Sequence, residues 1–168
     1  MVYFLSLGSN LGEREQTLRQ AMQQIEQQIG PVLRCSSFYY SEPWGFDSPN
    51  TFCNLCCAVE SDKTPLEVLH LTQHIERALG RKKKTQISNP QSPISNPQSP
   101  ISNPQSPIYS DRNIDIDLIR AFDEHGQEVM CQIEYPDTPA SKPLLVLPHP
   151  LWQQRDFVMV PLAEIMKI

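Results

Sequence analysis

The stretch "NIDIDLI", residues 113–119, alternates between apolar and polar side chains. Its middle five positions are Ile114, Asp115, Ile116, Asp117 and Leu118. Alternation with a period of two predicts a half-buried β-strand whose apolar side chains lie in the core. The two carboxylates then point the same way, with their Cα atoms about 6.7 Å apart. This stretch therefore predicts a core strand that carries a rigid pair of outward-facing carboxylates.

A strand and a helix are predicted at the start of the chain. Residues 2–7 form a short apolar run, which is typical of a buried strand. Apolar residues recur at helical spacing through residues 13–29, and Gly30 stops the pattern. Between the two lies "GSNLG", which we interpret as a strand-to-helix turn with Ser9 or Asn10 as the N-cap of the helix.

Two more strands and a second helix are predicted before residue 80. Residues 32–40 and 52–60 are rich in β-branched, aromatic and other apolar side chains, and the loop between them is dense in turn formers. This pattern predicts two antiparallel strands. Thr64 and Glu67 then form a capping box around Pro65, and apolar residues at helical spacing follow.

The predicted order of elements is β-α-β-β-α-β, with the strand at residues 114–118 as its last member. This order is the ferredoxin-like arrangement with an antiparallel sheet, and its class is α+β. After it, "FDEHGQEVM" predicts a C-terminal hairpin, "LLVLPHP" a further extended piece, and "RDFVMVPLAEI" a short helix. We expect residues 1–168 to form a single domain.

Composition excludes several classes of protein. The chain has 168 residues, 39% of them hydrophobic, and a net charge of −5, which argues against a protein that coats nucleic acid or an acidic membrane. No stretch approaches the roughly 20 apolar residues that cross a bilayer, and the first ten residues lack the pattern of a secretion signal. We therefore expect a cytoplasmic protein whose five cysteines are free thiols.

A repeat interrupts the chain just before the acidic strand. Residues 87–108 hold three copies of "ISNPQSP" and the Ile of a fourth. Two prolines in each copy exclude a helical coiled coil, so we expect an extended or disordered segment. Without residues 87–107, Arg81 and Arg112 would be separated by nine residues, which makes the repeat look like a low-complexity insertion in a short loop.

Cations gather around the predicted carboxylate pair. Five of them flank it in the sequence: Arg81, Lys82, Lys83, Lys84 and Arg112. An isolated Asp-x-Asp is most often a solvated strand face, but carboxylates can hold Mg²⁺ while cations contact the phosphates of a nucleoside triphosphate. His149 and Arg155 add two further phosphate-capable donors. The chain has no P-loop motif, so any phosphate site must be built differently.

Aromatic side chains lie in the loop that precedes the strand at residues 52–60. Trp44 and Phe46 lie in "SEPWGF", and Phe52 and Asn54 follow closely. Aromatic residues are usually core residues, but Pro- and Gly-containing loops run over the surface. Exposed rings beside an amide would suit a flat heteroaromatic ligand, which needs stacking faces and a few directed hydrogen bonds.

Taken in chain order, these motifs resemble the 6-hydroxymethyl-7,8-dihydropterin pyrophosphokinase family of folate biosynthesis. The matching pieces are "GSNLG", "SEPWGF" with "FCN", "IERALGR", "DRNIDIDLI", and "LPHP" with "RDFVMVPLAEI". They cover nearly the whole chain outside the repeat. The resemblance implies an ATP-dependent diphosphotransferase that transfers pyrophosphate to the hydroxymethyl group of the pterin and releases AMP.

The resemblance also implies roles for individual residues. Asp115 and Asp117 would hold two Mg²⁺ ions, and Arg81, Lys83 and Arg112 would act with them in catalysis. The residues implied to contact ATP are Gln73, Glu76, Arg81, Lys83, Leu118, His149 and Arg155. The residues implied to enclose the pterin are Ser41, Trp44, Phe52, Asn54, Tyr109 and Phe157. We expect a monomer whose partners are these two small substrates, with no nucleic acid and no membrane.

The sequence departs from the family pattern in the loop before the acidic strand. Lys83 stands where a second Arg is frequent, and Tyr109, Ser110 and Asp111 stand where Trp-Gly-Pro is common. Lys does not replace Arg in bidentate phosphate contacts. Two other readings stay open: a ferredoxin-like domain that binds nucleic acid, and an interaction protein that uses the P-x-x-P pattern of the repeat.

Overall fold

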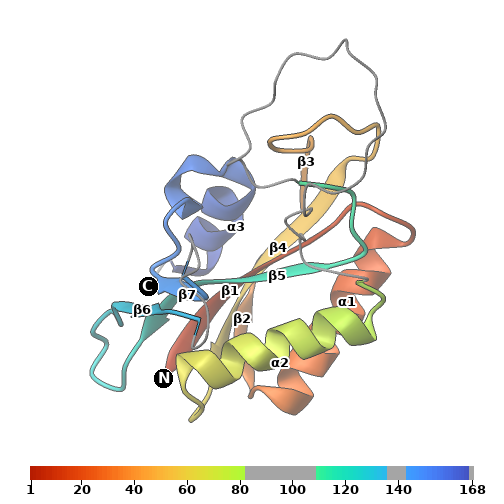
Figure 1. Ribbon diagram of the computed structural model, residues 1–168. Helices are drawn as coiled ribbons and strands as arrows, with labels where there is room; N and C mark the ends of the chain where they lie inside the picture. The colour runs from red at the N-terminus through yellow and green to blue at the C-terminus, as the bar shows by residue number, and fades with distance from the viewer. Residues whose placement is uncertain (82–108, 136–142, 167–168) are drawn as a thin grey trace.

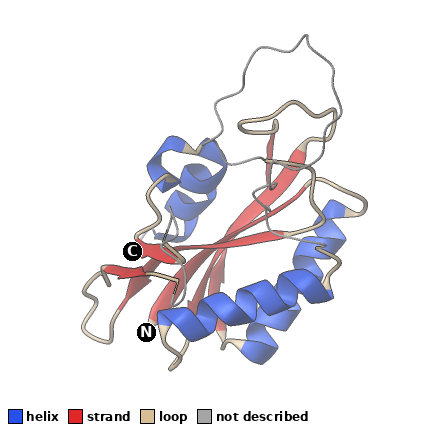
Figure 2. Cartoon of the chain, in the orientation of Figure 1, coloured by secondary structure: helices blue, strands red, loops and turns tan. Residues whose placement is uncertain are grey.

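A five-stranded antiparallel sheet forms the centre of the molecule (Figures 1 and 2). The computed structural model describes residues 1–81, 109–135 and 143–166. The strand order is β2-β4-β1-β5, and β3 also pairs with β4. Helices α1 and α2 cover one face of the sheet, and α3 covers the other (Figure 1). The predicted α+β class is confirmed.

The bounds of the elements follow the chain order. The first half contains β1 (Val2–Ser9), α1 (Arg14–Gln28), β2 (Val32–Cys35), β3 (Tyr39–Ser41), β4 (Phe52–Glu60) and α2 (Pro65–Ala78). The second half contains β5 (Asp115–Phe122), β6 (Cys131–Ile133), β7 (Leu145–Leu147), the 3₁₀ turn η1 (Trp152–Gln154) and α3 (Asp156–Met166). Strands β6 and β7 pair antiparallel in a separate two-stranded sheet.

The central position of β1 follows from its composition. Tyr3, Leu5 and Leu7 are fully buried, and β1 pairs with β4 on one side and β5 on the other. The pairing places Gly8 opposite Asn54 in β4 and opposite Asp115 in β5. The ends of the three middle strands therefore meet around one glycine, where no side chain from β1 fills the space.

The expected N-cap of α1 is wrong. Ser9 still pairs with Cys53, so β1 extends into the first two residues of the predicted turn, and α1 begins only at Arg14. Its N-cap is Glu13, and that side chain makes no capping hydrogen bond. Asn10 instead uses its side chain for contacts with a segment far along the chain, which local sequence could not reveal.

The single strand predicted at residues 32–40 is divided into β2 and β3. At the break, the Ser36 amide donates to the Cys56 carbonyl (2.9 Å), and the Ser36 hydroxyl accepts from the Cys56 amide (2.9 Å). A side-chain oxygen thus replaces a backbone carbonyl in the ladder, which interrupts the strand while the Cys56 amide stays paired.

A hydrophobic cluster lies on each face of the sheet. One lies under α1 and α2 and includes Cys53 and Cys57, and the other lies under α3 and includes Cys56. Cys53 and Cys56 therefore point to opposite faces of the sheet. All five cysteines are free thiols, as expected.

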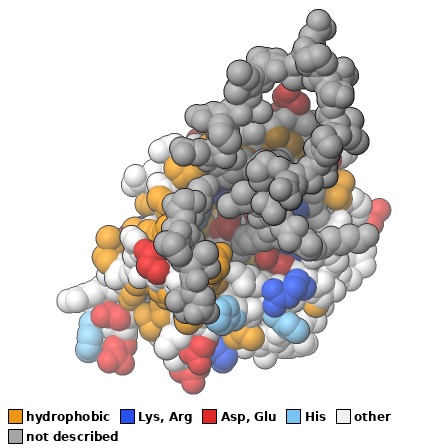
Figure 3. Space-filling view, viewed as in Figure 1, with side chains coloured by type: hydrophobic (Ala, Val, Ile, Leu, Met, Phe, Trp, Pro, Cys, Tyr) orange, Lys and Arg blue, Asp and Glu red, His pale blue; other side chains and the backbone are white. Residues whose placement is uncertain are grey.

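The predicted start of α2 is confirmed. Thr64 accepts a hydrogen bond from the Glu67 amide, the Glu67 carboxylate accepts from the Thr64 amide, and Pro65 occupies the first turn. Among the described residues, no helix is long and apolar enough to span a membrane. On the face that Figure 3 shows, the described Lys and Arg side chains lie among acidic ones rather than in one basic patch.

Part of the sequence lies outside the described residues. Lys82, Lys83, Lys84 and the "ISNPQSP" repeat at residues 87–108 belong to this part. Their expected roles and conformation therefore stay predictions.

Candidate active site

A pocket opens where the ends of β1, β4 and β5 meet the loop that follows β3 and the start of α3. Its ionisable lining residues are Glu42, Arg81, Arg112, Asp115, Asp117, His149 and Arg155. Its other lining residues are Ser6, Gly8, Ser41, Trp44, Phe46, Phe52, Asn54, Tyr109 and Phe157. The fold thus brings the acidic strand, the cations and the aromatic loop of the sequence into one pocket.

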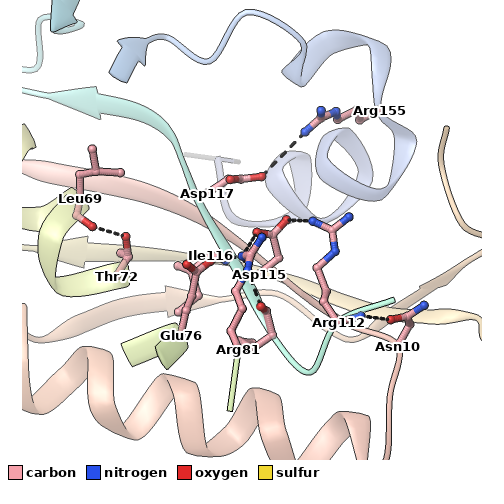
Figure 4. Close-up of polar contacts among 11 residues, drawn as sticks. Asn10, Leu69, Thr72, Glu76, Arg81, Arg112, Asp115, Ile116, Asp117 and Arg155 are labelled. Carbon is pink, nitrogen blue, oxygen red and sulfur yellow. Dashed lines mark hydrogen bonds and ion pairs between the residues drawn. The ribbon is translucent and has the colours of Figure 1, made fainter. Parts of the chain in front are cut away.

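Asp115 is held between two guanidinium groups (Figure 4). It lies at the first position of β5, and its Oδ2 accepts a hydrogen bond from Arg112 Nη1 at 2.8 Å. Its Oδ1 accepts a hydrogen bond from Arg81 Nη1. One carboxylate therefore fixes two cations that approach the pocket from different segments of the chain.

Asp117 lies two positions further along β5 and points to the same side of the strand. Its Oδ2 lies 3.8 Å from Nη1 of Arg155, a residue in the turn that leads into α3. Arg155 is only 6% exposed, whereas the side chain of Asp117 is 27% exposed. Figure 4 shows the two aspartates side by side, with Arg155 approaching Asp117 and with Arg81 and Arg112 approaching Asp115.

Glu76 stands behind this arrangement and is only 2% exposed. Its Oε1 accepts hydrogen bonds from Arg81 Nη1 (2.5 Å) and from the Ile116 amide (2.8 Å). The resemblance implied a contact with ATP, but Glu76 is not among the residues that line the pocket. In the structure its carboxylate joins α2 to β5 and holds Arg81 beside the acidic pair.

The charge of Arg81 is secured by these neighbours. Burial by itself would lower the pKa of its guanidinium, but the charges of Asp115 and Glu76 outweigh that effect and raise it. Arg81 therefore stays cationic, and its position is set by two carboxylates from different elements.

Aromatic rings form the opposite wall. Trp44 and Tyr109 meet edge to face, with ring centroids 5.6 Å apart. The Arg155 guanidinium lies 4.8 Å from the centroid of Trp44, and its Nη2 donates to the Tyr109 hydroxyl at 3.2 Å. Gly45, with φ +80°, lets the loop pass close to Tyr109, since a Cβ there would lie 3.1 Å from the ring. These contacts join the aromatic wall to the acidic strand through Arg155.

Asn54 and Ser41 form a polar edge beside the rings. The Asn54 amide nitrogen donates to the Tyr39 carbonyl (3.0 Å) and to the Ser41 hydroxyl (2.9 Å). A Cβ on Gly8 would lie 2.9 Å from the Asn54 amide oxygen, so the residue facing this amide must be glycine. The amide is thus fixed in one orientation at the floor of the pocket.

Most of the candidate substrate-binding residues line the pocket, but some do not. All six residues expected around the pterin line the pocket, and so do Arg81, His149 and Arg155 from the expected ATP set. His149 Nδ1 accepts a hydrogen bond from the Leu151 amide at 3.1 Å, which fixes the ring in place. Gln73 and the buried Leu118 do not line the pocket, and Lys83 lies outside the described residues.

Sequence reasoning missed one buried polar residue near the site. Asn10 is 3% exposed, and its Oδ1 accepts a hydrogen bond from the Arg112 amide at 2.8 Å. The backbone amide of Asn10 donates in turn to the Arg112 carbonyl at 3.2 Å. The "GSNLG" motif therefore anchors the residue that holds Asp115. The only signal for this in the sequence was the motif itself.

The acidic pair is the candidate metal site. Within the described ranges, no group of three or more His, Cys, Asp or Glu side chains is arranged to hold a metal ion. Mg²⁺, however, usually binds proteins through only one or two carboxylates and takes its other ligands from water and substrate phosphates. Asp115 and Asp117 both line the pocket, so their donor set fits this mode of binding.

Comparison with known proteins gives consistent matches along the chain. A family model described as 7,8-dihydro-6-hydroxymethylpterin-pyrophosphokinase (HPPK) matches residues 4–167. The chain is 39% identical over 164 residues to the 2-amino-4-hydroxy-6-hydroxymethyldihydropteridine pyrophosphokinase of Porphyromonas gingivalis, which covers 98% of this chain and 90% of that protein. It is 29% identical over 165 residues to the enzyme of the same name from Bacillus subtilis, with 98% and 77% covered.

A solved structure shares the fold. It is described as a crystal structure analysis of HPPK-DHPS in complex with substrates, and the TM-score is 0.59 at 14% sequence identity. The match covers 98% of this chain but only 40% of that longer chain. At this identity the likeness concerns the fold alone.

Proposed function

Because this chain belongs to the 7,8-dihydro-6-hydroxymethylpterin-pyrophosphokinase family, we propose that its pocket transfers pyrophosphate from ATP to the hydroxymethyl group of 6-hydroxymethyl-7,8-dihydropterin. The products are AMP and the pterin diphosphate, in a step of folate biosynthesis. The observation that carries the proposal is one pocket in which a fixed acidic pair with three arginines faces a wall of aromatic rings. This arrangement suits a polyphosphate on one side and a flat ring on the other.

The polyphosphate side is formed by cations that the protein holds in place. Asp115 fixes Arg81 and Arg112, and Arg155 lies between the aromatic wall and Asp117. Guanidinium groups match phosphate oxygens in charge and in planar geometry. With His149 and Lys83, these residues would contact the triphosphate of ATP. Gln73, Glu76 and Leu118 would lie on the nucleotide side, Glu76 acting by holding Arg81.

The pterin side is formed by rings and one oriented amide. Trp44, Phe52, Tyr109 and Phe157 would enclose the ring faces, and Asn54 with Ser41 would bond to the polar edge of the pterin. Its own hydrogen bonds orient the Asn54 amide, so its oxygen has one fixed direction. Fixed polar groups favour a ligand with the matching donors, because a mismatched ligand leaves buried groups unpaired.

Asp115 and Asp117 would hold Mg²⁺, two ions by the family resemblance. Bound there, Mg²⁺ would supply charge neutralisation at the triphosphate and lower the pKa of the substrate hydroxyl. The two carboxylates supply oxygen ligands on one rigid strand, while Arg81 and Arg112 keep Asp115 from turning away.

The reaction is an in-line attack of the pterin hydroxyl oxygen on the β-phosphorus of ATP, with AMP as the leaving group. Such a transfer depends on positioning and on charge stabilisation rather than on a covalent nucleophile in the protein. Arg81, Arg112 and Arg155 stabilise charge on the transferred group, and the aromatic wall sets the position of the attacking oxygen. The pocket therefore needs no catalytic cysteine or serine.

The finer features of the sequence-based picture are part of the same proposal. The observed strand order supports a ferredoxin-like core, with β2 and β3 together in the place of its second strand. We also propose one domain over residues 1–168, a monomer and action in the cytoplasm. The length and apolar content of the chain support the single domain.

The nucleotide product tests the proposed function. Purified protein is incubated with ATP, Mg²⁺ and 6-hydroxymethyl-7,8-dihydropterin, and the nucleotides are separated by chromatography. We expect AMP and the pterin diphosphate in equal amounts, with no turnover when the pterin is omitted. Formation of ADP instead would contradict pyrophosphoryl transfer. Tight binding of RNA or of a proline-motif partner without turnover would favour the other two readings.

A further inference from the structure

Two loops that line the pocket are joined through the carboxylate of Asp111. This residue lies two positions after Tyr109 and directly before Arg112. Its Oδ1 accepts a hydrogen bond from Asn10 Nδ2 at 2.7 Å, and its Oδ2 accepts one from Asn50 Nδ2 at 2.9 Å. Asn10 follows β1, whereas Asn50 ends the loop between β3 and β4 that carries Trp44. One side chain thus connects three segments that are distant in the sequence.

The bonds are those of an ionised carboxylate. The pKa of the Asp111 carboxyl is lowered, chiefly by its hydrogen bond with the Ser48 hydroxyl and further by the bonds from Asn10 and Asn50. Ser48 and Asn50 both belong to the loop that carries Trp44. Since hydrogen bonds to charged groups are stronger than neutral ones, this contact is a firm polar attachment for that loop.

The apolar attachment of the same loop lies two residues earlier. Tyr109 packs against Trp44, and a Cβ at position 45, where φ is +80°, would lie 3.1 Å from the Tyr109 ring. The segment at residues 109–111 therefore holds the aromatic loop at two points, through the ring of Tyr109 and through the carboxylate of Asp111.

Arg112 has an attachment of its own. Its backbone amide and carbonyl both bond to Asn10, and its side chain bonds to Asp115. Loss of the Asp111 carboxylate would remove one hydrogen bond from Asn10 Nδ2, which keeps its bond to the Asn50 carbonyl (3.3 Å), so the bonds between Asn10 and Arg112 should remain. The consequence should therefore fall on the aromatic loop and not on the cations of the polyphosphate side.

We propose that Asp111 is a positioning residue for the pterin: it holds the loop of Trp44 and Phe46 against Tyr109 so that the aromatic wall is preformed. This inference rests on the proposed function, because it concerns the same pocket. It assigns a role to a position at which this chain departs from the family pattern, and neither the sequence nor the resemblance suggested one.

Steady-state kinetics of Asp111→Ala provide the first test. We expect the KM for the pterin to rise about tenfold, as for loss of hydrogen bonds to a charged group, while the KM for ATP changes less than twofold. Asp47→Ala, which removes an exposed carboxylate from the same loop, is the matched control and should behave like the unmodified protein. Equal changes in both KM values, or none, would overturn the proposal.

A reciprocal exchange separates positioning from general damage. Asn50→Asp alone would place two carboxylates together and should raise the KM for the pterin further than Asn50→Ala. In the double variant Asp111→Asn with Asn50→Asp, the new amide can accept from Asn10 and donate to the new carboxylate. We expect the double variant to recover most of the lost pterin affinity. Failure to recover in a folded double variant would contradict the assignment.

Fluorescence gives a readout that does not depend on turnover. The chain has two tryptophans, so in a Trp152→Phe background Trp44 is the only reporter. We expect Asp111→Ala to increase acrylamide quenching of Trp44, and the double variant to reverse the increase. Unchanged quenching would overturn the proposal even if KM changed. If the unmodified protein forms no AMP, the proposed function fails, whereas quenching that responds to Asp111 still shows the attachment of the loop.

Discussion

Asp115 and Asp117 lie two positions apart on β5, but their surroundings differ. Asp115 compensates two largely buried guanidinium groups, those of Arg81 and Arg112. Asp117 is more exposed and lies 3.8 Å from Arg155. Removing one partner of a buried ion pair leaves an uncompensated charge, which destabilises a protein strongly. Loss of the Asp115 carboxylate should therefore cost more stability than loss of the Asp117 carboxylate, whose pair with Arg155 is longer.

The two isosteric variants should therefore behave differently. We expect Asp117→Asn to lower kcat/KM at least about a hundredfold, because it removes an oxygen ligand and a negative charge at the proposed metal site. Its midpoint of thermal unfolding should fall less than that of Asp115→Asn, because the 3.8 Å pair between Asp117 and Arg155 is longer than the pair between Asp115 and Arg112. Asp115→Asn should lose activity and also about 2 kcal/mol of stability.

Asp62→Asn, an exposed change away from the pocket, is the control for both variants. Activity assays and thermal melts on the three proteins check the prediction. Near-normal turnover by Asp117→Asn would refute the metal assignment, and an unchanged melt for Asp115→Asn would refute its role in compensating the arginines.

At the scale of elements, α2 carries the supporting residues of the site. The helix starts at a capping box and delivers Glu76 near its end, with Arg81 just beyond it. Glu76 then bonds to β5 through the Ile116 amide. The contacts of Glu76 with Arg81 and with the Ile116 amide fix the position of the helix end relative to β5. The end of α2 therefore contributes to the geometry of the pocket through Glu76 and Arg81.

The capping box should add a pH-dependent part to stability. Hydrogen bonds from the Thr64 amide and hydroxyl lower the pKa of Glu67 below its usual 4.5. Because the folded pKa is the lower one, this stabilisation is present above pH 4.5 and is lost as the pH falls through the folded pKa. Glu67→Gln can keep the reciprocal bonds, so it should remove mainly the pH-dependent part.

Urea unfolding between pH 7 and pH 3 checks this expectation. The unmodified protein should lose more stability than Glu67→Gln over that range. Thr64→Ala removes the hydroxyl but keeps the backbone amide that bonds to Glu67, so it should cost about 1 kcal/mol as a lost cap and reduce the pH dependence only in part. Parallel pH curves for all three proteins would contradict the role of Glu67.

At the scale of the whole molecule, long-range contacts hold together the two ends of the connection between α2 and β5. The end of α2 and the start of β5 are joined by a segment that contains the repeat at residues 87–108, which lies outside the described residues. Arg81 and Arg112, the residues on either side, both bond to Asp115. The two ends of the connection are therefore held together by the site itself.

Removing residues 87–107 should leave an active enzyme. The entropy of closing a flexible loop grows only slowly with length, so a change of 21 residues alters stability by about 1 kcal/mol. We expect kcat close to that of the unmodified protein and a KM for ATP that is equal or lower. A variant with 21 Gly and Ser residues in place of the repeat separates the effect of length from that of sequence. A folded deletion variant without turnover would show that the repeat has a function.

Much of the fold was predictable because local patterns decide it. The alternation at residues 114–118, the helical spacing of α1 and the capping box of α2 each depend on neighbours within a few residues, and all three are found as expected. The candidate pterin residues could be named because the motifs that carry them resemble a family. The break at Ser36 could not be foreseen, since it depends on a bond to Cys56, 20 residues away.

The sequence by itself determined the α+β class, the acidic pair on its strand and the family to which the chain belongs. Only the tertiary structure decided how these parts are held: Asn10 bonds to Asp111 across 101 residues, and Glu76 bonds to the Ile116 amide across 40. Local patterns report the preferences of short segments, whereas a buried polar side chain must find its partner wherever the folded chain brings one. For this reason the residues that orient the site are visible only in three dimensions.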